Sequence, residues 1–216
     1  IAENFAKIKS RLPAQVTLIA VSKTKPVEVI LEAYNTGQRI FGENKVQELV
    51  PKYEALPKDI QWHQIGHLQS NKVKYIAPFV AMIHAVESFK LAAEINKQAE
   101  KNNRTIDVLL QVFIAQEETK FGLSDEELFS LLSSAEFKAL KNIRIRGLMG
   151  MATNTDNKEQ ITNEFRHLQK LFTKVQEGFV LPAFDTLSMG MSSDYELAVE
   201  AGSTMVRVGS LLFGNR

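Results

Sequence analysis

The chain has 216 residues, of which 44% are hydrophobic and 24% are charged, a composition typical of a folded globular protein. Its 26 basic and 25 acidic residues leave a formal charge of +1, so we expect no nucleic-acid partner, because phosphate-backbone binding usually needs a basic excess. No run reaches the ~18 apolar residues of a membrane span, so we expect no membrane association. The cysteine-free sequence excludes disulfides and thiol catalysis and fits a cytoplasmic location.

In chain order, helical patterns alternate with short segments rich in β-branched and aromatic residues. Residues 4–12 have an amphipathic pattern that predicts a helix at the start of the chain. Eight later segments are bounded by turn or capping residues and read as strands. They are residues 16–23, 39–44, 61–66, 82–86, 107–114, 144–151, 184–190 and 204–210.

Capping patterns mark the start of two helices between these strands. Ser124 with Glu127 forms a capping box, and Ser193 with Glu196 predicts a second box before a helix that Gly202 ends. Eight strands that alternate with helices indicate a parallel sheet closed into a barrel. We therefore predict an α/β fold, a TIM-type (β/α)8 barrel that forms a single domain over residues 1–216. No ordinary eighth helix is expected after the last strand, and the additional N-terminal helix could close that side.

The carboxyl ends of barrel strands carry the site in essentially every TIM-barrel enzyme, so polar residues there are the candidates. Alternation along the eighth strand puts Val206 and Val208 on the helix-facing side and turns Arg207 into the barrel. The same alternation turns Lys23 inward at the open end of the first strand. The candidates at strand ends are Lys23, Asn44, His63, the loop from Ser188 to Ser192, Arg207, Gly209 and Ser210.

These residue types together indicate a bound anion. A buried lysine and a buried arginine in one cavity, without matching carboxylates at strand ends, need a negative charge to neutralise them. The loop from Ser188 to Ser192 runs into a helix whose N–H groups favour an anion, and Gly209 with Ser210 offers a second backbone cluster. A lysine beside a phosphate site is suited to forming a Schiff base with an aldehyde. Pyridoxal 5′-phosphate supplies both groups.

Six segments, spread in order over nearly the whole chain, resemble those of the pyridoxal phosphate homeostasis protein family. The resemblance implies a single-domain barrel similar to the N-terminal domain of alanine racemase, with pyridoxal 5′-phosphate carried as an internal aldimine. The lysine of that aldimine would be the first lysine of the first segment, Lys23. The segments are VSKTKP (21–26), FGEN (41–44), WHQIGHLQSNK (62–72), RIRGLMGM (144–151), LSMGMSSD (187–194) and GSTMVRVGSLLFG (202–214).

The resemblance also implies roles for the residues around the cofactor. Arg207 would face the pyridine nitrogen, while Asn44 and Met149 would line the ring; an ion pair inside the barrel is the structural alternative for Arg207. Ser210 stands where many members have threonine, which keeps the hydroxyl. The phosphate would be held by Ser192, Gly209 and Ser210, with backbone groups of Gly190 and Met191.

Other polar residues have two interpretations. Lys25 is the rival of Lys23, but Pro26 follows it directly and favours a place on the rim. His63 and His84 would be metal ligands only if a third ligand converged on them, and packed core histidines are favoured. Lys72 and Lys120 resemble family positions, yet a solvated role at the cavity mouth is equally compatible with the sequence.

Two classes of function remain, an amino-acid enzyme such as a racemase and a non-catalytic protein that buffers and delivers the cofactor. A phosphosugar enzyme would leave Lys23 and Arg207 without roles. Racemisation needs an acid or base on each face of the substrate, and in alanine racemase a separate C-terminal domain brings the second one, a tyrosine. We expect no such domain here, and Arg207 would weaken the cofactor as an electron sink. The tyrosines fall on predicted helices: Tyr34, Tyr53, Tyr75 and Tyr195.

The carrier is therefore the favoured interpretation. The resemblance implies a role in cofactor homeostasis, with secondary effects on amino-acid and keto-acid pools. Cofactor-free pyridoxal phosphate enzymes would be the partners that receive the cofactor, and a racemase-like enzyme is the alternative.

Overall fold

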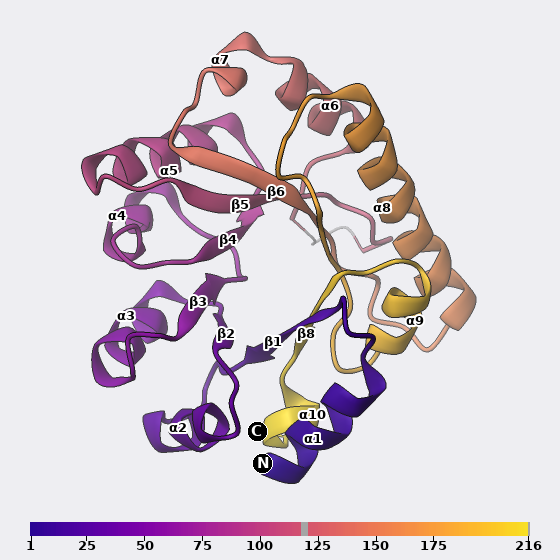
Figure 1. Ribbon diagram of the computed structural model, residues 1–216. Coiled ribbons are helices and arrows are strands. Elements are labelled where there is room, and N and C mark those ends of the chain that lie inside the picture. The colour runs from indigo at the N-terminus through magenta and orange to yellow at the C-terminus, as the bar shows by residue number, and fades with distance from the viewer. Residues whose placement is uncertain (118–120, 216) are drawn as a thin grey trace.

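The computed structural model describes residues 1–117 and 121–215 (Figure 1). Its strands are all parallel and pair in sequence order, and the last strand returns to pair with the first. The predicted (β/α)8 barrel is confirmed. Its strands are β1 (Thr17–Val21), β2 (Ile40–Glu43), β3 (Gln61–Gln64), β4 (Met82–Val86), β5 (Ile106–Gln111), β6 (Ile143–Met149), β7 (Thr186–Ser188) and β8 (Met205–Val208).

Helices surround the barrel on its outer side (Figure 1). The described part of the chain has no helix long and apolar enough to cross a membrane. The helices are α1 (Ala2–Arg11), α2 (Val27–Asn35), α3 (Val46–Ala55), η1 (Ser70–Lys72), α4 (Val73–Ile76), α5 (Phe89–Lys101), α6 (Asp125–Ser133), α7 (Ala135–Lys138), α8 (Lys158–Gly178), α9 (Tyr195–Glu200) and α10 (Ser210–Phe213).

The N-terminal helix is present and lies beside the end of the chain, on the side that the sequence analysis expected it to close. Only the short helix α10 follows β8 in the described residues, and α1 lies beside it (Figure 1). The rings of Phe5 and Phe213 pack in a T-shaped arrangement with centroids 5.8 Å apart, and the side-chain amide of Asn4 donates to the carbonyl of Leu212 at 3.1 Å. Helix α1 therefore takes the place of an ordinary eighth helix.

Side chains alternate along the strands as predicted, which divides the core into two layers. In β1, Leu18 and Ala20 join the cluster between strands and helices, while Ile19 lies inside the barrel. In β8, Val206 and Val208 lie in the outer cluster. The inner cluster is small and rich in methionine, and it consists of Ile19, Met82, Leu109, Met149 and Met205.

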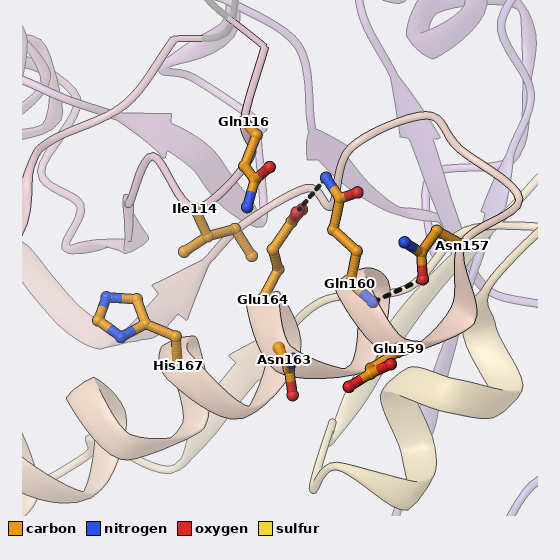
Figure 2. Close-up of a pocket in the computed structure, with 8 residues that line it drawn as sticks. All are labelled: Ile114, Gln116, Asn157, Glu159, Gln160, Asn163, Glu164 and His167. Carbon is orange, nitrogen blue, oxygen red and sulfur yellow. Dashed lines mark hydrogen bonds between the residues drawn. The ribbon is translucent and has the colours of Figure 1, made fainter.

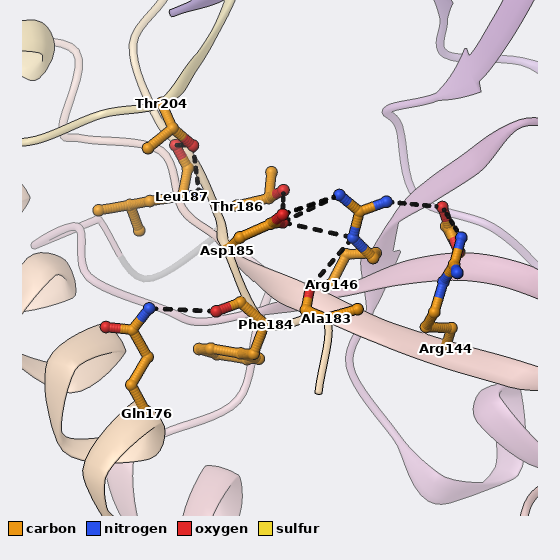
Figure 3. Close-up of polar contacts among 10 residues, drawn as sticks. Arg144, Arg146, Gln176, Ala183, Phe184, Asp185, Thr186, Leu187 and Thr204 are labelled. Atoms are coloured by element: carbon orange, nitrogen blue, oxygen red, sulfur yellow. Dashed lines mark hydrogen bonds and ion pairs between the residues drawn. The ribbon is translucent and has the colours of Figure 1, made fainter. Parts of the chain in front are cut away.

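An ion network lies among the first residues of β5 and β6 and the segment before β7 (Figure 3). Asp107 accepts from Arg144 Nε at 2.7 Å and from Arg146 Nη1 at 3.0 Å. Arg146 also donates from Nη2 to Asp185 at 2.9 Å. Ion pairs thus join the strands at the amino-terminal end of the barrel, and the candidate site residues lie at the opposite, carboxyl-terminal end.

Two local predictions need correction. All predicted strands except residues 82–86, which match β4, extend too far at their carboxyl ends. The chain turns before Lys23, Asn44 and Gly209 and places all three in loops. The predicted capping box at Ser193 is wrong, since Asp194 is the N-cap of α9 and its carboxylate accepts from the N–H of Met191 at 2.7 Å. The box of Ser124 with Glu127 is confirmed at the start of α6.

Candidate functional site

A cavity of about 720 Å³ lies among the loops that follow the carboxyl ends of the strands. Most of the residues singled out from the sequence line it. Met149 belongs to the inner core, and His63, Ser188 and Gly190 are buried and are not part of the lining. The candidates that the fold brings to the cavity wall are Lys23, Asn44, Met191, Ser192, Arg207, Gly209 and Ser210.

Lys23 lies in the turn that follows β1 and is half-buried at the cavity wall. The neighbouring Lys25 points elsewhere, because its Nζ donates to the carbonyl of Gly214 at 3.4 Å. Of the two lysines in this segment, Lys23 is the one that faces the cavity.

Arg207 projects from β8 into the barrel and is 3% exposed. Its Nη1 donates to the Ser188 hydroxyl at 2.5 Å and to the Ser188 carbonyl at 3.2 Å, and Nη2 donates to the carbonyl of Gly150 at 3.2 Å. Burial lowers the pKa of Arg207 to about 10, partly opposed by the charge of Asp194. The guanidinium remains charged at neutral pH, and its hydrogen bonds go to a hydroxyl and two carbonyls.

Behind Arg207, a hydrogen-bonded chain crosses the inside of the barrel. Ser188 Oγ lies 3.2 Å from Nδ1 of His84, and Nε2 of His84 lies 2.8 Å from Nδ1 of His63. Both histidines are buried, in agreement with their interpretation as core residues. Burial lowers the pKa of His63 to about 3 and that of His84 well below 6.5, with the charges of His63 and Arg207 adding to the shift in His84.

The direction of this chain follows from Arg207, because a guanidinium can only donate. Ser188 accepts that hydrogen bond and can give its own hydrogen to Nδ1 of His84. His84 then carries its proton on Nε2 and donates to Nδ1 of His63. Neutral histidines thus orient Ser188, and Ser188 orients Arg207.

Ser192, Gly209 and Ser210 meet at one side of the cavity. The N–H of Gly209 donates to the hydroxyl of Ser192 at 3.3 Å, which joins the loops after β7 and β8. A Cβ at Gly209 would lie 3.2 Å from the carbonyl oxygen of Val21 and would narrow this corner. The N–H of Met191, another residue of the lining, donates to Asp194 Oδ1 at 2.7 Å.

Gly190 has a different part in the site. Its φ of 106° lies in the left-handed region, and a Cβ there would meet the Cβ of Ala198 at 2.6 Å. Its carbonyl accepts from the N–H of Arg207 at 2.9 Å. Gly190 therefore allows α9 to pack closely and shapes the loop from beneath.

Another part of the cavity wall is formed by residues that were not predicted from strand ends. His67 and Phe121 stack there with ring centroids 4.4 Å apart, and His67 Nδ1 lies 3.1 Å from Glu87 Oε1. Gln111 also lines the cavity and donates to the carbonyl of Phe121 at 3.2 Å. His67 falls within the segment WHQIGHLQSNK, which is a signal in the sequence, but its pairing with a distant phenylalanine is set by the fold.

The other lysines considered from the sequence are not part of the described lining. Lys72 lies in η1, with its Nζ 5.8 Å from the centroid of the Tyr75 ring. Lys120 lies outside the described residues.

A second, polar pocket of about 470 Å³ lies beside the first turns of α8 (Figure 2). Its buried carboxylate, Glu164, accepts from the N–H and hydroxyl of Thr153 at 2.7 and 3.0 Å and from Gln160 at 3.1 Å. These bonds fix the loop after β6, so Glu164 is a structural support. Within the described residues, no group of three or more His, Cys, Asp or Glu could hold a metal ion.

Comparison with known proteins places this geometry in context. The family model described as "Alanine racemase, N-terminal domain" matches residues 1–216. The pyridoxal phosphate homeostasis protein of Aquifex aeolicus is 46% identical over 200 residues, covering 92% of this chain and 86% of that protein. The protein of the same name from Escherichia coli is 36% identical and covers 100% of this chain and 97% of its own length.

Solved structures agree with these relatives. PipY of Synechococcus elongatus with bound PLP is 38% identical, with a TM-score of 0.90 and 99% of each chain covered. An alanine racemase of Clostridium difficile, at 19% identity and a TM-score of 0.81, covers 99% of this chain and 59% of its own, and shares the fold. The chain therefore belongs to the pyridoxal phosphate homeostasis protein family, on a barrel of the alanine racemase N-terminal type.

Proposed function

We propose that this protein binds pyridoxal 5′-phosphate through a Schiff base on Lys23 and serves in cofactor homeostasis, without amino-acid turnover of its own. The observation that carries the proposal is the cavity, which combines Lys23 and Arg207 with a cradle of serine and glycine. No aspartate or glutamate belongs to its described lining. Two cationic side chains in one cavity favour an anionic ligand.

The residues present fit this cofactor in size and chemistry. The cavity volume lies within the range of small-molecule sites, roughly 300–1,000 Å³. Ser192, Gly209 and Ser210 offer hydroxyl and backbone groups suited to a phosphate. The Lys23 amine would condense with the aldehyde and release one water molecule. When bound, the cofactor supplies an electrophilic carbon and a conjugated ring.

Arg207 would meet the pyridine nitrogen with a donor that cannot accept a proton. It is held by Ser188 and Gly150, and its pKa of about 10 keeps it charged. A ring nitrogen facing such a donor stays unprotonated, which weakens the ring as an electron sink. Asn44 and Met191 would line the ring. Met149, expected beside the ring, would support this wall from the core beneath.

Homeostasis is favoured over racemisation by the rest of the lining. A second acid or base is needed opposite Lys23, and no tyrosine belongs to the described cavity wall. His67 is the remaining titratable side chain of that wall, stacked on Phe121 and bonded to Glu87. The names of the curated relatives and the PLP-bound PipY support the same function.

Delivery to cofactor-free enzymes, secondary effects on amino-acid and keto-acid pools, and a cytoplasmic location belong to the same proposal. They rest on the family relationship, and the first is directly testable. Holoprotein should activate a cofactor-free pyridoxal phosphate enzyme faster than the measured release of free cofactor explains. Activation at the rate of release would leave buffering as the role.

The decisive experiment is an absorption spectrum of the purified protein with pyridoxal 5′-phosphate, before and after borohydride, followed by peptide mapping. We expect a visible band that borohydride removes and a pyridoxyl group on Lys23. A label on Lys25 or Lys120 would refute the assignment. In parallel, a panel of amino acids should show no enantiomer interconversion, decarboxylation or keto-acid formation. Turnover of about 1 s⁻¹ would favour the racemase-like alternative, and His67→Gln would then test its acid.

A further inference from the structure

An ion cluster, buried at Lys52 and Glu43 and partly exposed at Glu48, lies directly behind the turn that carries Lys23. It consists of Glu43 at the end of β2 and Glu48 and Lys52 on α3, and we call it the Lys52 cluster. The side chains of Lys52 and Glu43 are 7% and 0% exposed, and Lys52 Nζ lies 2.8 Å from Glu43 Oε1 and 2.9 Å from Glu48 Oε1. None of the three residues belongs to the cavity lining.

The Lys52 cluster forms hydrogen bonds with the residue on each side of Lys23. On one side, Lys52 Nζ donates to the carbonyl of Ser22 at 2.9 Å, and the Ser22 hydroxyl donates to Glu43. On the other side, the N–H of Thr24 donates to Glu48 Oε1 at 2.5 Å. Lys23 is thus the central residue of a turn whose neighbours are both bonded to one cluster.

The conformation of this turn needs such support. Thr24 has a φ of 65°, in the left-handed region that β-branched residues rarely adopt, so the surrounding structure must hold it there. The turn is otherwise closed by one backbone hydrogen bond, from the N–H of Lys25 to the carbonyl of Ser22 at 3.1 Å. Without the Lys52 cluster, we expect the turn to sample other conformations and Lys23 to leave the cavity wall.

The Lys52 ammonium is itself committed to this role. Its three hydrogens match three acceptors, the Ser22 carbonyl, Glu43 and Glu48. It is buried and all three of its hydrogens are bonded within the protein, so it is not available to attack an aldehyde. Lys52 and Lys23 are therefore neighbouring lysines with separate tasks, one structural and one directed to the ligand.

We propose that the Lys52 cluster is a positioning device for Lys23, which presets the turn so that the Lys23 amine meets the aldehyde of a ligand bound in the cavity. The proposal rests on the proposed function. It predicts that the cluster affects the covalent step and leaves binding by the phosphate and the ring unchanged.

Two ligands separate these contributions. Pyridoxal 5′-phosphate can react with Lys23, whereas pyridoxine 5′-phosphate has an alcohol in place of the aldehyde and can bind only through the phosphate and the ring. The ratio of their dissociation constants therefore measures the covalent step. A general loss of structure would lower the affinity for both ligands alike and leave the ratio of their dissociation constants unchanged.

The test compares Glu48→Ala, Glu48→Gln and Glu54→Ala. Glu48→Ala removes the acceptor of the Thr24 N–H, while Glu48→Gln keeps an oxygen there. Glu54→Ala removes an exposed carboxylate from the same helix and is the matched control. We expect Glu48→Ala to lower the affinity for the aldehyde by about tenfold or more, with the affinity for pyridoxine 5′-phosphate unchanged. Glu48→Gln and Glu54→Ala should keep the wild-type ratio.

Borohydride labelling gives a second readout. Glu48→Ala should label Lys23 more slowly than wild type at equal ligand occupancy, and Lys52 should stay unlabelled in both. The proposal would be overturned if Glu48→Ala lowered the affinity for both ligands equally, or if it left the ratio of the two dissociation constants unchanged. If wild-type protein itself gives no label on Lys23, the Schiff base of the proposed function fails, and this inference falls with it.

Discussion

The histidine pair inside the barrel makes the protein sensitive to mild acid. His63 and His84 are buried and neutral, with pKa values that burial lowers to about 3 and well below 6.5, respectively. In the unfolded chain both titrate near 6.5. Below that pH the unfolded chain binds more protons than the folded protein, so the free energy of unfolding falls as the pH falls.

The size of the effect follows from linkage. Each histidine that stays neutral in the folded state lowers the free energy of unfolding by up to about 1.4 kcal/mol per pH unit. Between about pH 7 and about pH 5.5, the two histidines together should lower the free energy of unfolding by about 2.5 kcal/mol. Typical domains have only about 5–15 kcal/mol in total. The loss continues down to the folded-state pKa, near 3 for His63.

Carboxylates with shifted pKa values contribute to the pH dependence in their own directions. Burial raises the pKa of Glu43, so the folded state takes up that proton first and gains stability as the pH falls, which opposes the histidines. Asp59, whose pKa is lowered by the Tyr34 hydroxyl, loses its stabilising contribution only at lower pH. A comparison of slopes between variants therefore isolates the histidines.

The assay is urea unfolding of cofactor-free protein at a series of pH values. Wild type should lose stability steeply below about pH 6.5, whereas the double variant His63→Gln, His84→Gln should show a shallower slope whatever its absolute stability. If both proteins had the same slope between about pH 5.5 and 7, the histidines could not be neutral in the folded state, and the direction assigned to the chain from Arg207 to His63 would be wrong.

Four substitutions test the rest of the molecule. Lys23→Ala should remove the visible absorption band of the cofactor complex, measured spectroscopically, while phosphate-dependent affinity persists. Ser192→Ala should lower the affinity for pyridoxal 5′-phosphate severalfold, as measured by titration. Gly209→Asp should lower it far more, because it adds a negative charge and bulk beside Val21. Equal affinity of wild type for pyridoxal and pyridoxal 5′-phosphate would contradict the phosphate site. Asp107→Ala breaks ion pairs to two arginines at the other mouth and should cost about 1–2 kcal/mol in denaturant unfolding with cofactor affinity unchanged.

Much of the fold could be predicted from the sequence because barrel strands have local signatures. Alternation alone placed Arg207 inside and Val206 outside, and the capping box at Ser124 was correct. The second box failed at Ser193 because α9 begins one residue later than predicted, with Asp194 at the N-cap position and no side-chain cap hydrogen bond. The residue at which a helix begins within a polar loop is decided by loop geometry, which the sequence does not specify.

The candidate site was only partly visible for a related reason. Asn44, at the end of the segment FGEN, was predicted as a site residue. Its neighbour Glu43 was not, because a charged residue on the helix-facing side of a strand has no obvious role. The partner of Glu43 is Lys52, nine positions later on a helix whose orientation is set by packing. His67 and Phe121 likewise come together only when the barrel closes.

Lys52 and Arg207, two buried basic side chains at this end of the barrel, differ in their partners, and that contrast bears on function. Lys52 donates to two carboxylates and a carbonyl of the protein, so it needs no ligand as a further partner. Arg207 is just as deeply buried, yet its hydrogen bonds reach a hydroxyl and two carbonyls, and it opens onto the cavity. A buried charge left without a carboxylate bonded to it costs stability. A ligand with an acceptor atom and negative charge would offset that cost, so we expect Arg207 to contribute to ligand affinity and the Lys52 cluster to act only on the turn that carries Lys23.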